Sequence, residues 1–349
     1  GRAGGGVWGT LGGRERREPA ATEPVGYLVP PGFEAWPALV RYLGEGGRVV
    51  VMDEPFTIDG RDWPRGTLLI ERRGAAALPP LGELAETAVP VSSGRVEEGN
   101  DLGTGRSYTL ELPRLGVLTG DGVSPTSYGA HWFFLDQTLR LAFDAIPAPS
   151  LDDGGLDELN VLVVPEANLS DEQIETLGDW VRAGGTLVAV AGGAADVAGP
   201  IAEIEIREPE DSASIEAALR GREARELEEW EQEIPGTVLP AVLDPAHPLA
   251  FGAGIDRHAD RMFVLHGGGD VFEPATSFES VAYFPAQLED ASGVISTENL
   301  DRLSRAAWLV TKSVGEGRVI LFADDPLFRH FWYSGFQPYV NALLVGPAL

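Results

Sequence analysis

Two adjacent carboxylates, Asp324 and Asp325, follow an apolar run at 318–323 (RVILFA) that is typical of a buried strand. Such a pair could bind a hard cation or act as general acid and base. Successive residues of a strand point to opposite faces, so both reach one ligand only if a turn intervenes. Pro326 favours a turn in which one aspartate caps the segment that follows. Asp324 and Asp325 could therefore either belong to a functional site or stabilise the turn.

A second group of candidates follows the strand expected at 114–119 (RLGVLT). The loop GDGVSPTSYG comes next, and Tyr128 and His131 stand where a helix is expected to begin. A glycine-rich loop between strand and helix can hold an anion. This loop has neither G-x-G-x-x-G nor a Walker lysine, which argues against nucleotide binding. Tyr128 and His131 could face a ligand cleft, or they could pack against and cap the helix.

A polar and aromatic cluster comes directly after the two aspartates, with Arg329, His330, Trp332 and Tyr333 within five positions. Such a cluster could line a cleft, or it could pin its loop to the sheet. Arg329 is the cation of the group and therefore a candidate for contacting a ligand. The predicted ligand-binding residues are Tyr128, His131, Asp324, Asp325 and Arg329.

Known catalytic patterns are missing from the sequence. Zinc peptidase chemistry needs two imidazoles and a carboxylate around one metal. None of the 5 histidines begins H-x-x-E, no pair has the H-E-x-x-H spacing, and no G-x-S-x-G follows a strand. With no cysteine, disulfides, thiolate metal sites and cysteine nucleophiles are excluded. The sequence predicts no catalytic residue and no metal site. The histidines are His131, His247, His258, His266 and His330.

The charge balance limits the classes of partner. Lysine and arginine number 26 against 54 aspartates and glutamates, a formal net charge of −28. Phosphate binding needs clustered cations, so nucleic acid is not an expected partner. No run of about 18 apolar residues is present, so no membrane span is expected. An acidic surface suits high salt or an extracellular setting, and a hydrophobic content of 44% allows a sizeable core.

The chain length of 349 residues fits two domains better than one. Residues 1–25, rich in Gly, Arg and Glu, are predicted to be a flexible linker. They include no initiator methionine and no signal-like apolar region, which suggests a fragment of a longer polypeptide. Residues 26–112 are predicted to form a small α/β domain with a helix over 33–43. Residues 113–349 are predicted to form a larger α/β domain.

Residues 160–195 are the centre of the larger predicted domain. The apolar run 161–164 predicts a parallel strand covered on both faces. Ser170 and Gln173 form the capping-box pattern that begins a helix, and the next strand is expected at 186–190. Strand, helix and strand joined by short links indicate a right-handed parallel crossover. Further strands are expected at 114–119, 263–265, 280–284, 307–310 and 318–323, and further helices at 130–143, 214–232 and 337–345.

The segment 185–195, GTLVAVAGGAA, resembles the nucleophile elbow of class I glutamine amidotransferase-like proteins, such as PfpI-like and ThuA-like domains. In those proteins a strand is followed by Cys-x-Gly. On this sequence the cysteine position falls on Ala191 and the following glycine on Gly193. An alanine cannot attack a carbonyl, so the resemblance implies a degenerate elbow without amidotransferase activity. The implied fold is a flavodoxin-like, class I glutamine amidotransferase-like three-layer parallel sheet, preceded by the small α/β unit.

From about residue 26 to its end the chain is also similar to the C-terminal region of large bacterial zinc carboxypeptidases of the carboxypeptidase A/T type. The resemblance implies a secreted or periplasmic parent whose zinc ligands and catalytic glutamate lie in an upstream peptidase domain. No zinc ligand matches here, so no cofactor is expected in this chain. The matching stretches are RDWPRGTLLI, LPRLGVLTGDGVSPTSYGAHWFFLDQTL, LNVLVVPEANLSDEQIETLGDWVRAGGTLVAVAGGAA, DPAHPLAFG, GRVILFADDPLFRHFW and NALLVGP.

Three functional hypotheses follow. The first is a non-catalytic accessory module of a zinc metallocarboxypeptidase, with the upstream peptidase domain as its partner and a peptide or glycan as a further partner. The second is a pseudo-amidotransferase domain that binds a sugar or peptide through the loops of Tyr128, His131, Asp324 and Asp325. The third is a hydrolase that uses Asp324 or His131, and it predicts loss of activity on Asp324→Asn.

Overall fold

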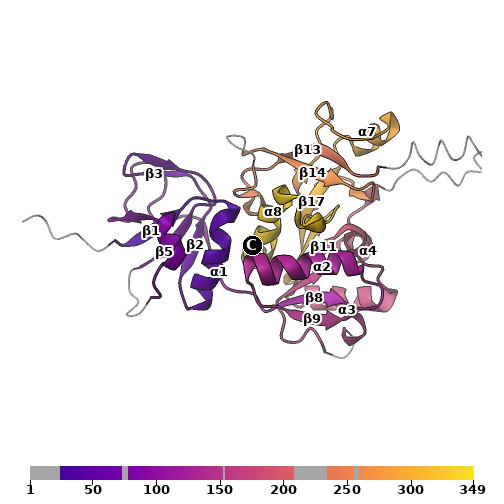
Figure 1. Ribbon diagram of the computed structural model, residues 1–349, viewed down its shortest axis with the longest axis horizontal. Helices are drawn as coiled ribbons and strands as arrows, with labels where there is room; N and C mark the ends of the chain where they lie inside the picture. Colours follow the sequence, from indigo (N-terminus) through magenta and orange to yellow (C-terminus); the bar gives the residue numbers. More distant parts are fainter. Residues whose placement is uncertain (1–23, 73–77, 152–153, 208–233, 255–258) are drawn as a thin grey trace, which may run out of the picture.

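The computed structural model describes residues 24–72, 78–151, 154–207, 234–254 and 259–349. Most of the predicted linker 1–25 and the whole predicted helix 214–232 lie outside the described residues. Figure 1 shows a smaller unit, formed by the first part of the chain, beside a larger one. Among the described residues, no helix is both long enough and apolar enough to cross a membrane.

The smaller unit is built on an antiparallel sheet rather than on alternating parallel strands. In the described part of this unit the strand order is β6-β1-β5-β2-β7, and every pairing is antiparallel. A separate hairpin of β3 and β4 stands beside the sheet. The strands are β1 (Gly26–Val29), β2 (Val49–Met52), β3 (Phe56–Ile58), β4 (Arg61–Trp63), β5 (Leu68–Glu71), β6 (Val89–Val91) and β7 (Ser107–Thr109).

Helix α1 (Trp36–Gly44) covers the small sheet and also contacts the larger unit. It forms where the apolar spacing predicted a helix, after a 3₁₀ turn over Phe33–Ala35. Phe33 packs 5.7 Å from the ring of Phe134 and 5.3 Å from that of Phe336. The indole Nε1 of Trp36 donates a hydrogen bond of 3.1 Å to Gln337 Oε1. These contacts join the two units through one apolar core.

The larger sheet is mixed, which corrects the prediction of a parallel sheet. Within the described residues, β9, β8, β10, β11 and β18 are parallel neighbours in that spatial order. In chain order this is 2-1-3-4-5, an order found in doubly wound sheets. These strands are β8 (Leu115–Thr119), β9 (Asp144–Pro147), β10 (Val161–Val164), β11 (Thr186–Val190) and β18 (Gly317–Phe322).

The other half of the sheet is antiparallel, in the order β14-β13-β16-β17, and joins the parallel half where β17 pairs with β18. A two-residue hairpin can connect only antiparallel strands, and Gly315 provides the positive φ of 63° that its first turn position requires. These strands are β13 (Thr237–Leu243), β14 (Arg261–His266), β16 (Glu279–Tyr283) and β17 (Ala307–Val314). Strand β15 (Val271–Phe272) pairs with β17, and β12 (Ile206–Arg207) pairs with β15.

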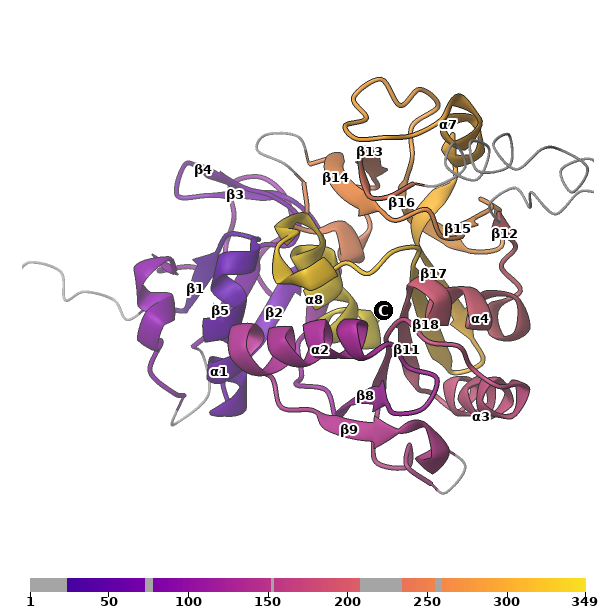
Figure 2. The ribbon, with the colours of Figure 1, turned by 45° about the vertical axis from the view of Figure 1, so that its right-hand side comes forward.

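Helices cover both faces of the parallel half. Helices α2 (Pro125–Phe133) and α8 (Phe336–Leu344) lie on one face, and α3 (Asp171–Arg182) and α4 (Ala191–Ala202) lie on the other (Figure 2). Strands β10 and β11, at the centre of this half, are buried throughout, as their continuous apolar runs predicted. A further helix, α7 (Thr297–Leu303), stands beside the antiparallel half.

Two helix starts illustrate how local sequence acts. Helix α3 has the predicted capping box, in which Ser170 and Gln173 each bond the other's backbone N–H. Helix α2 begins earlier than the predicted residue 130, because the Ser124 side chain caps it and Pro125 is tolerated in a first turn. It continues as a π-helical stretch, Phe134–Leu139, and ends before the predicted residue 143 because Arg140 turns left-handed with φ 57°.

Candidate functional site

Ligands in open α/β sheets bind beyond the carboxyl ends of the parallel strands. Strands β8, β10, β11 and β18 all end at one edge, because each is parallel to its neighbour. The residues directly after these four ends are therefore the candidates for a site. They include the start of helix α4, the loop after β10, the start of helix α2 and the Asp324–Asp325 pair.

Ala191 occupies the tight turn between β11 and α4, and its φ is 49°. A residue with a Cβ in this left-handed region costs about 1–2 kcal/mol. A strained turn from strand to helix is the geometry of a nucleophile elbow. The side chain here is a methyl group, which cannot act as a nucleophile.

The two glycines after Ala191 let helix α4 begin close to the loop after β10. A Cβ on Gly193 would lie 2.4 Å from the carbonyl oxygen of Pro165 and 2.8 Å from Val164 Cγ1. A Cβ on Gly192 would lie 3.0 Å from the carbonyl oxygen of Ala167. Gly193 is thus required by the close approach of the two backbones.

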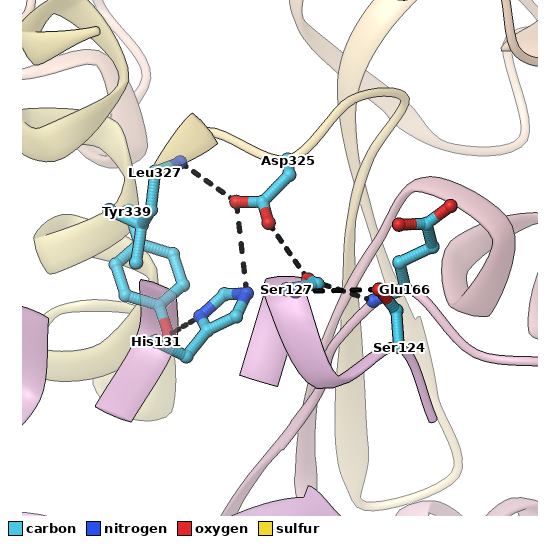
Figure 3. A network of polar contacts seen from close by, with 7 residues as sticks. All are labelled: Ser124, Ser127, His131, Glu166, Asp325, Leu327 and Tyr339. Atoms are coloured by element: carbon cyan, nitrogen blue, oxygen red, sulfur yellow. Dashed lines mark hydrogen bonds and ion pairs between the residues drawn. The ribbon is translucent and has the colours of Figure 1, made fainter. Parts of the chain in front are cut away.

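A network of polar contacts joins the ends of three strands (Figure 3). Ser127 Oγ donates a hydrogen bond of 2.8 Å to Asp325 Oδ2 and accepts one of 3.1 Å from the backbone N–H of Glu166. Asp325 Oδ1 accepts a hydrogen bond of 2.9 Å from the N–H of Leu327, two residues on. The predicted capping by one aspartate is therefore made by Asp325. Helix α2 and the loops after β10 and β18 are held together by this network.

His131 extends the network into the protein interior. Its Nδ1 lies 2.7 Å from the hydroxyl of Tyr339, and its Nε2 lies 3.8 Å from Asp325 Oδ1. Burial lowers the pKa of His131 below its ordinary 6.5, although the nearby Asp325 charge acts to raise it. Burial also raises the pKa of the Tyr339 hydroxyl well above its ordinary value. Both side chains are therefore neutral near pH 7.

The order of contacts separates this network from a catalytic triad. In a Ser-His-Asp triad the imidazole hydrogen-bonds to the serine hydroxyl and acts as its base. Here Ser127 bonds the carboxylate of Asp325, while the ring of His131 bonds Tyr339. Ser127 and His131 are also buried, with 3% and 0% of their surface exposed. The network is built to hold elements together rather than to activate a hydroxyl.

Asp324 binds different groups from those of its neighbour. Its Oδ2 accepts hydrogen bonds of 2.9 Å each from His266 Nδ1 and Trp308 Nε1, and its Oδ1 accepts one of 2.9 Å from the N–H of Gly267. This buried cluster ties the end of β14 to β17 and to the end of β18. The two aspartates do not converge on one ligand, as the alternation of strand residues suggested.

The predicted ligand-binding residues differ in their surroundings. His131 and Asp324 are buried, and Tyr128 is half-buried against the core. Asp325 is half-buried and accepts hydrogen bonds from Ser127 and Leu327. Arg329 is exposed, and its guanidinium lies 5.2 Å from the centre of the Phe328 ring. In the described ranges no group of three or more His, Asp or Glu side chains could hold a metal ion.

Sequence reasoning missed several partners in these clusters. Ser127 lies inside the loop that was singled out, but its type alone did not distinguish it from its neighbours. Tyr339, His266 and Trp308 gave no signal, because they meet their partners only after the sheet has assembled. The sequence does place a tyrosine and a tryptophan within apolar segments. A buried hydroxyl or indole N–H needs a hydrogen-bond partner, but the sequence does not show which residue that partner is.

Three cavities lie away from this edge. One of about 330 Å³ is lined by β13, β14 and the segment after β16, including Arg261, Phe263 and Glu289. A second, of about 590 Å³, is lined by Arg207 and Tyr283 among others, and a third, of about 600 Å³, lies beside the end of α4. None of the three is lined by Ala191, Ser127 or Asp325.

Comparison with known proteins gives no family membership. No family model matches the chain, and no curated protein matches it. The chain is similar to solved structures that include an exo-β-1,4-mannosidase from Opitutaceae bacterium strain TAV5, with 13% identity and a TM-score of 0.38 over 66% of this chain. The chain spans only 36% of that mannosidase.

Two other similar structures are of the kinds that the elbow resemblance named. One is a ThuA-like protein from Bacteroides uniformis, with 10% identity and a TM-score of 0.38 over 66% of this chain and 89% of that one. The other is a glutamine amidotransferase from Thermotoga maritima, with 9% identity and a TM-score of 0.38 over 67% of this chain and 96% of that one.

Proposed function

We propose that this chain is a non-catalytic accessory module with a flavodoxin-like, class I glutamine amidotransferase-like fold. The observation that carries the proposal is Ala191, which has the strained backbone of an elbow and no nucleophile. The 2-1-3-4-5 order of the parallel strands, with helices on both faces, supports the fold. The hydrogen bonds that occupy Ser127, Asp324 and Asp325 support a structural role for the polar groups at the carboxyl edge.

The parent of the module is proposed to be a secreted or periplasmic zinc metallocarboxypeptidase, on the strength of the sequence resemblance. Zinc and the peptidase residues belong in that proposal to an upstream domain, which is also the first partner. The module would stabilise that domain, present its substrate, or attach it to a wall polymer. The acidic balance, −28 at neutral pH, suits an extracellular setting.

The test measures zinc-dependent hydrolysis of an N-blocked dipeptide that has a free C-terminal carboxylate. We expect no hydrolysis by this chain alone with added zinc, and hydrolysis by the longer polypeptide that contains the upstream domain. Activity of this chain that chelation abolishes would contradict the non-catalytic assignment. An upstream coding sequence without H-x-x-E and a later histidine would contradict the parentage while leaving the fold assignment intact.

A second candidate function is binding of a sugar or peptide. One observation favours it over a purely structural role: Arg329 is exposed and lies among exposed aromatic rings in the segment after Asp325. The four other predicted ligand residues are buried or half-buried. Ligand contact in this candidate therefore falls to the segment that contains Arg329. A thermal-shift screen with sugars and short peptides tests it, and no shift with any of them would contradict it.

A further inference from the structure

Exposed aromatic side chains collect on helix α2 and on the segment directly after β18. Phe133, Phe328, Phe331 and Tyr333 have 42%, 37%, 54% and 67% of their surface exposed. We call these four residues the aromatic surface. Grouped exposed rings differ from single ones, because a group of large apolar side chains marks a binding surface while scattered ones need no explanation.

Ring contacts place these side chains together. The ring of His330 lies 4.6 Å from that of Phe133 and 6.3 Å from that of Tyr333. The ring of Phe328 lies 5.8 Å from that of Phe331. Helix α2 contacts the 3₁₀ turn Phe328–His330, so the rings come from two chain segments in contact, one after β8 and one after β18. Both segments follow strands of the parallel half of the larger sheet.

The segment is held in an unusual backbone conformation. Arg329 and His330 both have positive φ, at 48° and 56°, and each such residue costs about 1–2 kcal/mol. Side-chain hydrogen bonds hold it there. His330 Nε2 lies 2.8 Å from Thr138 Oγ1, and Trp332 Nε1 donates a hydrogen bond of 3.2 Å to the carbonyl oxygen of Phe263. The backbone that carries the rings is thus held in place before a ligand arrives, which reduces the conformational entropy lost on binding.

Charge selects the kind of ligand. From Leu327 to Leu349 the sequence has no acidic residue and one arginine, Arg329, in a chain whose net charge is −28. Nucleic acid, anionic lipid or a second copy of this chain would be repelled by the rest of the molecule. A basic partner would be drawn to the acidic parts of the surface instead. An uncharged ligand fits this region best.

Polar groups beside the rings indicate which kind of uncharged ligand would bind. The guanidinium of Arg329 lies 5.2 Å from the centre of the Phe328 ring, and Tyr333 has a hydroxyl, so polar groups accompany the rings of the aromatic surface. A sugar ring presents C–H groups that stack on an aromatic face and hydroxyls that bond neighbouring polar groups. A stable protein interface needs about 800 Å² of complementary surface per partner, which a few separated rings do not provide.

We propose that the aromatic surface binds a neutral polysaccharide. Phe331 and Tyr333 stack on sugar rings, and Arg329 donates hydrogen bonds to sugar hydroxyls. The inference rests on the second candidate function, for which it names the ligand class, and it is independent of the peptidase parentage.

The test is native affinity electrophoresis of this chain in gels that contain soluble β-glucan, arabinoxylan or galactomannan, with pull-down on insoluble cellulose and chitin. We expect retardation or capture by at least one neutral polymer. Each of Phe331→Ala and Tyr333→Ala should weaken the affinity about tenfold, and Tyr333→Phe should stay within about threefold of the parent chain. The matched control is Tyr283→Ala, an exposed tyrosine on β16, which should bind as the parent does.

No binding to any of the polymers, or binding that Phe331→Ala and Tyr333→Ala leave unchanged, would overturn the proposal. If the tripeptide Gly-Leu-Tyr raises the melting temperature while no polysaccharide binds, the second candidate function stands and this inference fails. Concentration-dependent dimerisation in light scattering, or binding to anionic vesicles, that both alanine variants abolish would assign the aromatic surface to another partner. Circular dichroism of each variant confirms that the fold is retained.

Discussion

Ser127 and Asp325 lie 198 positions apart in the chain and share a hydrogen bond of 2.8 Å at the carboxyl edge of the parallel strands. The serine comes from the first helix after β8, and the aspartate comes from the loop after β18. Because the Glu166 N–H also bonds Ser127 Oγ, this hydroxyl connects at one point the segments that follow β8, β10 and β18. Removal of this hydroxyl tests whether the network stabilises the fold.

Ser127→Ala is expected to lower the free energy of unfolding by about 2 kcal/mol, because the Glu166 N–H and an Asp325 oxygen lose their partly buried hydrogen-bond partner. Urea denaturation followed by circular dichroism measures the change. Ser107→Ala, at an exposed position on β7, is the control and should change stability by less than about 0.5 kcal/mol. Equal effects of the two substitutions would contradict a stabilising role for the network.

Gly193→Ala is expected to destabilise the protein by about 2 kcal/mol or more, because its Cβ would lie 2.4 Å from the Pro165 carbonyl oxygen. Gly129→Ala, inside helix α2, is the matched control. Its Cβ would meet no atom within 4 Å, and alanine favours helix, so it should stabilise by about 0.5–1 kcal/mol. Thermal and urea unfolding of the pair measure both effects. A neutral Gly193→Ala would mean that the elbow is not closely packed.

The buried His131 predicts a stability that falls as pH falls. Its pKa is lowered in the folded state, so below pH 6.5 the unfolded chain binds a proton that the folded chain does not. The contribution of neutral His131 to the free energy of unfolding is full above pH 6.5. As pH falls from 6.5 toward the pKa of the folded state, this contribution decreases by up to about 1.4 kcal/mol per pH unit. Urea unfolding at pH 7.5 and at pH 5.5 measures the loss.

His247 and His330 also have pKa values lowered by burial, so they add to the same trend. Comparison with His131→Gln separates the contribution of His131. The variant is expected to have a lower free energy of unfolding than the parent chain at pH 7.5. The difference between the two free energies should become smaller toward pH 5.5. A deficit that stays constant with pH would show that His131 does not titrate in this way.

Ala191→Cys places a single thiol at the elbow of a chain that has no cysteine. The start of helix α4 should lower the pKa of that thiol, because a helix N-terminus stabilises a thiolate. Ala195→Cys, at a position on the same helix that is also half-buried, is the control. Alkylation by iodoacetamide at pH 7, followed by mass spectrometry, should be several-fold faster at position 191. Equal rates would contradict an elbow that activates its side chain.

The sequence by itself determined the parts of this protein that depend on near neighbours. Continuous apolar runs at 161–164 and 186–190 predicted buried strands, and both form there. The capping box of Ser170 and Gln173 is present as predicted. The elbow at Ala191 was also visible, because its strand, small residues and helix are adjacent in the chain. These signals act within a few residues, so no knowledge of the tertiary fold was needed.

Only the tertiary structure decided which polar groups meet. Asp324 and Asp325 are neighbours in sequence, yet one binds His266 and Trp308 and the other binds Ser127. The antiparallel half of the sheet and the aromatic surface likewise depend on how distant segments pack. A hydrogen bond or ring contact across such a separation leaves no periodic pattern in the chain, because its partners are set by the strand order and the crossovers of the sheet.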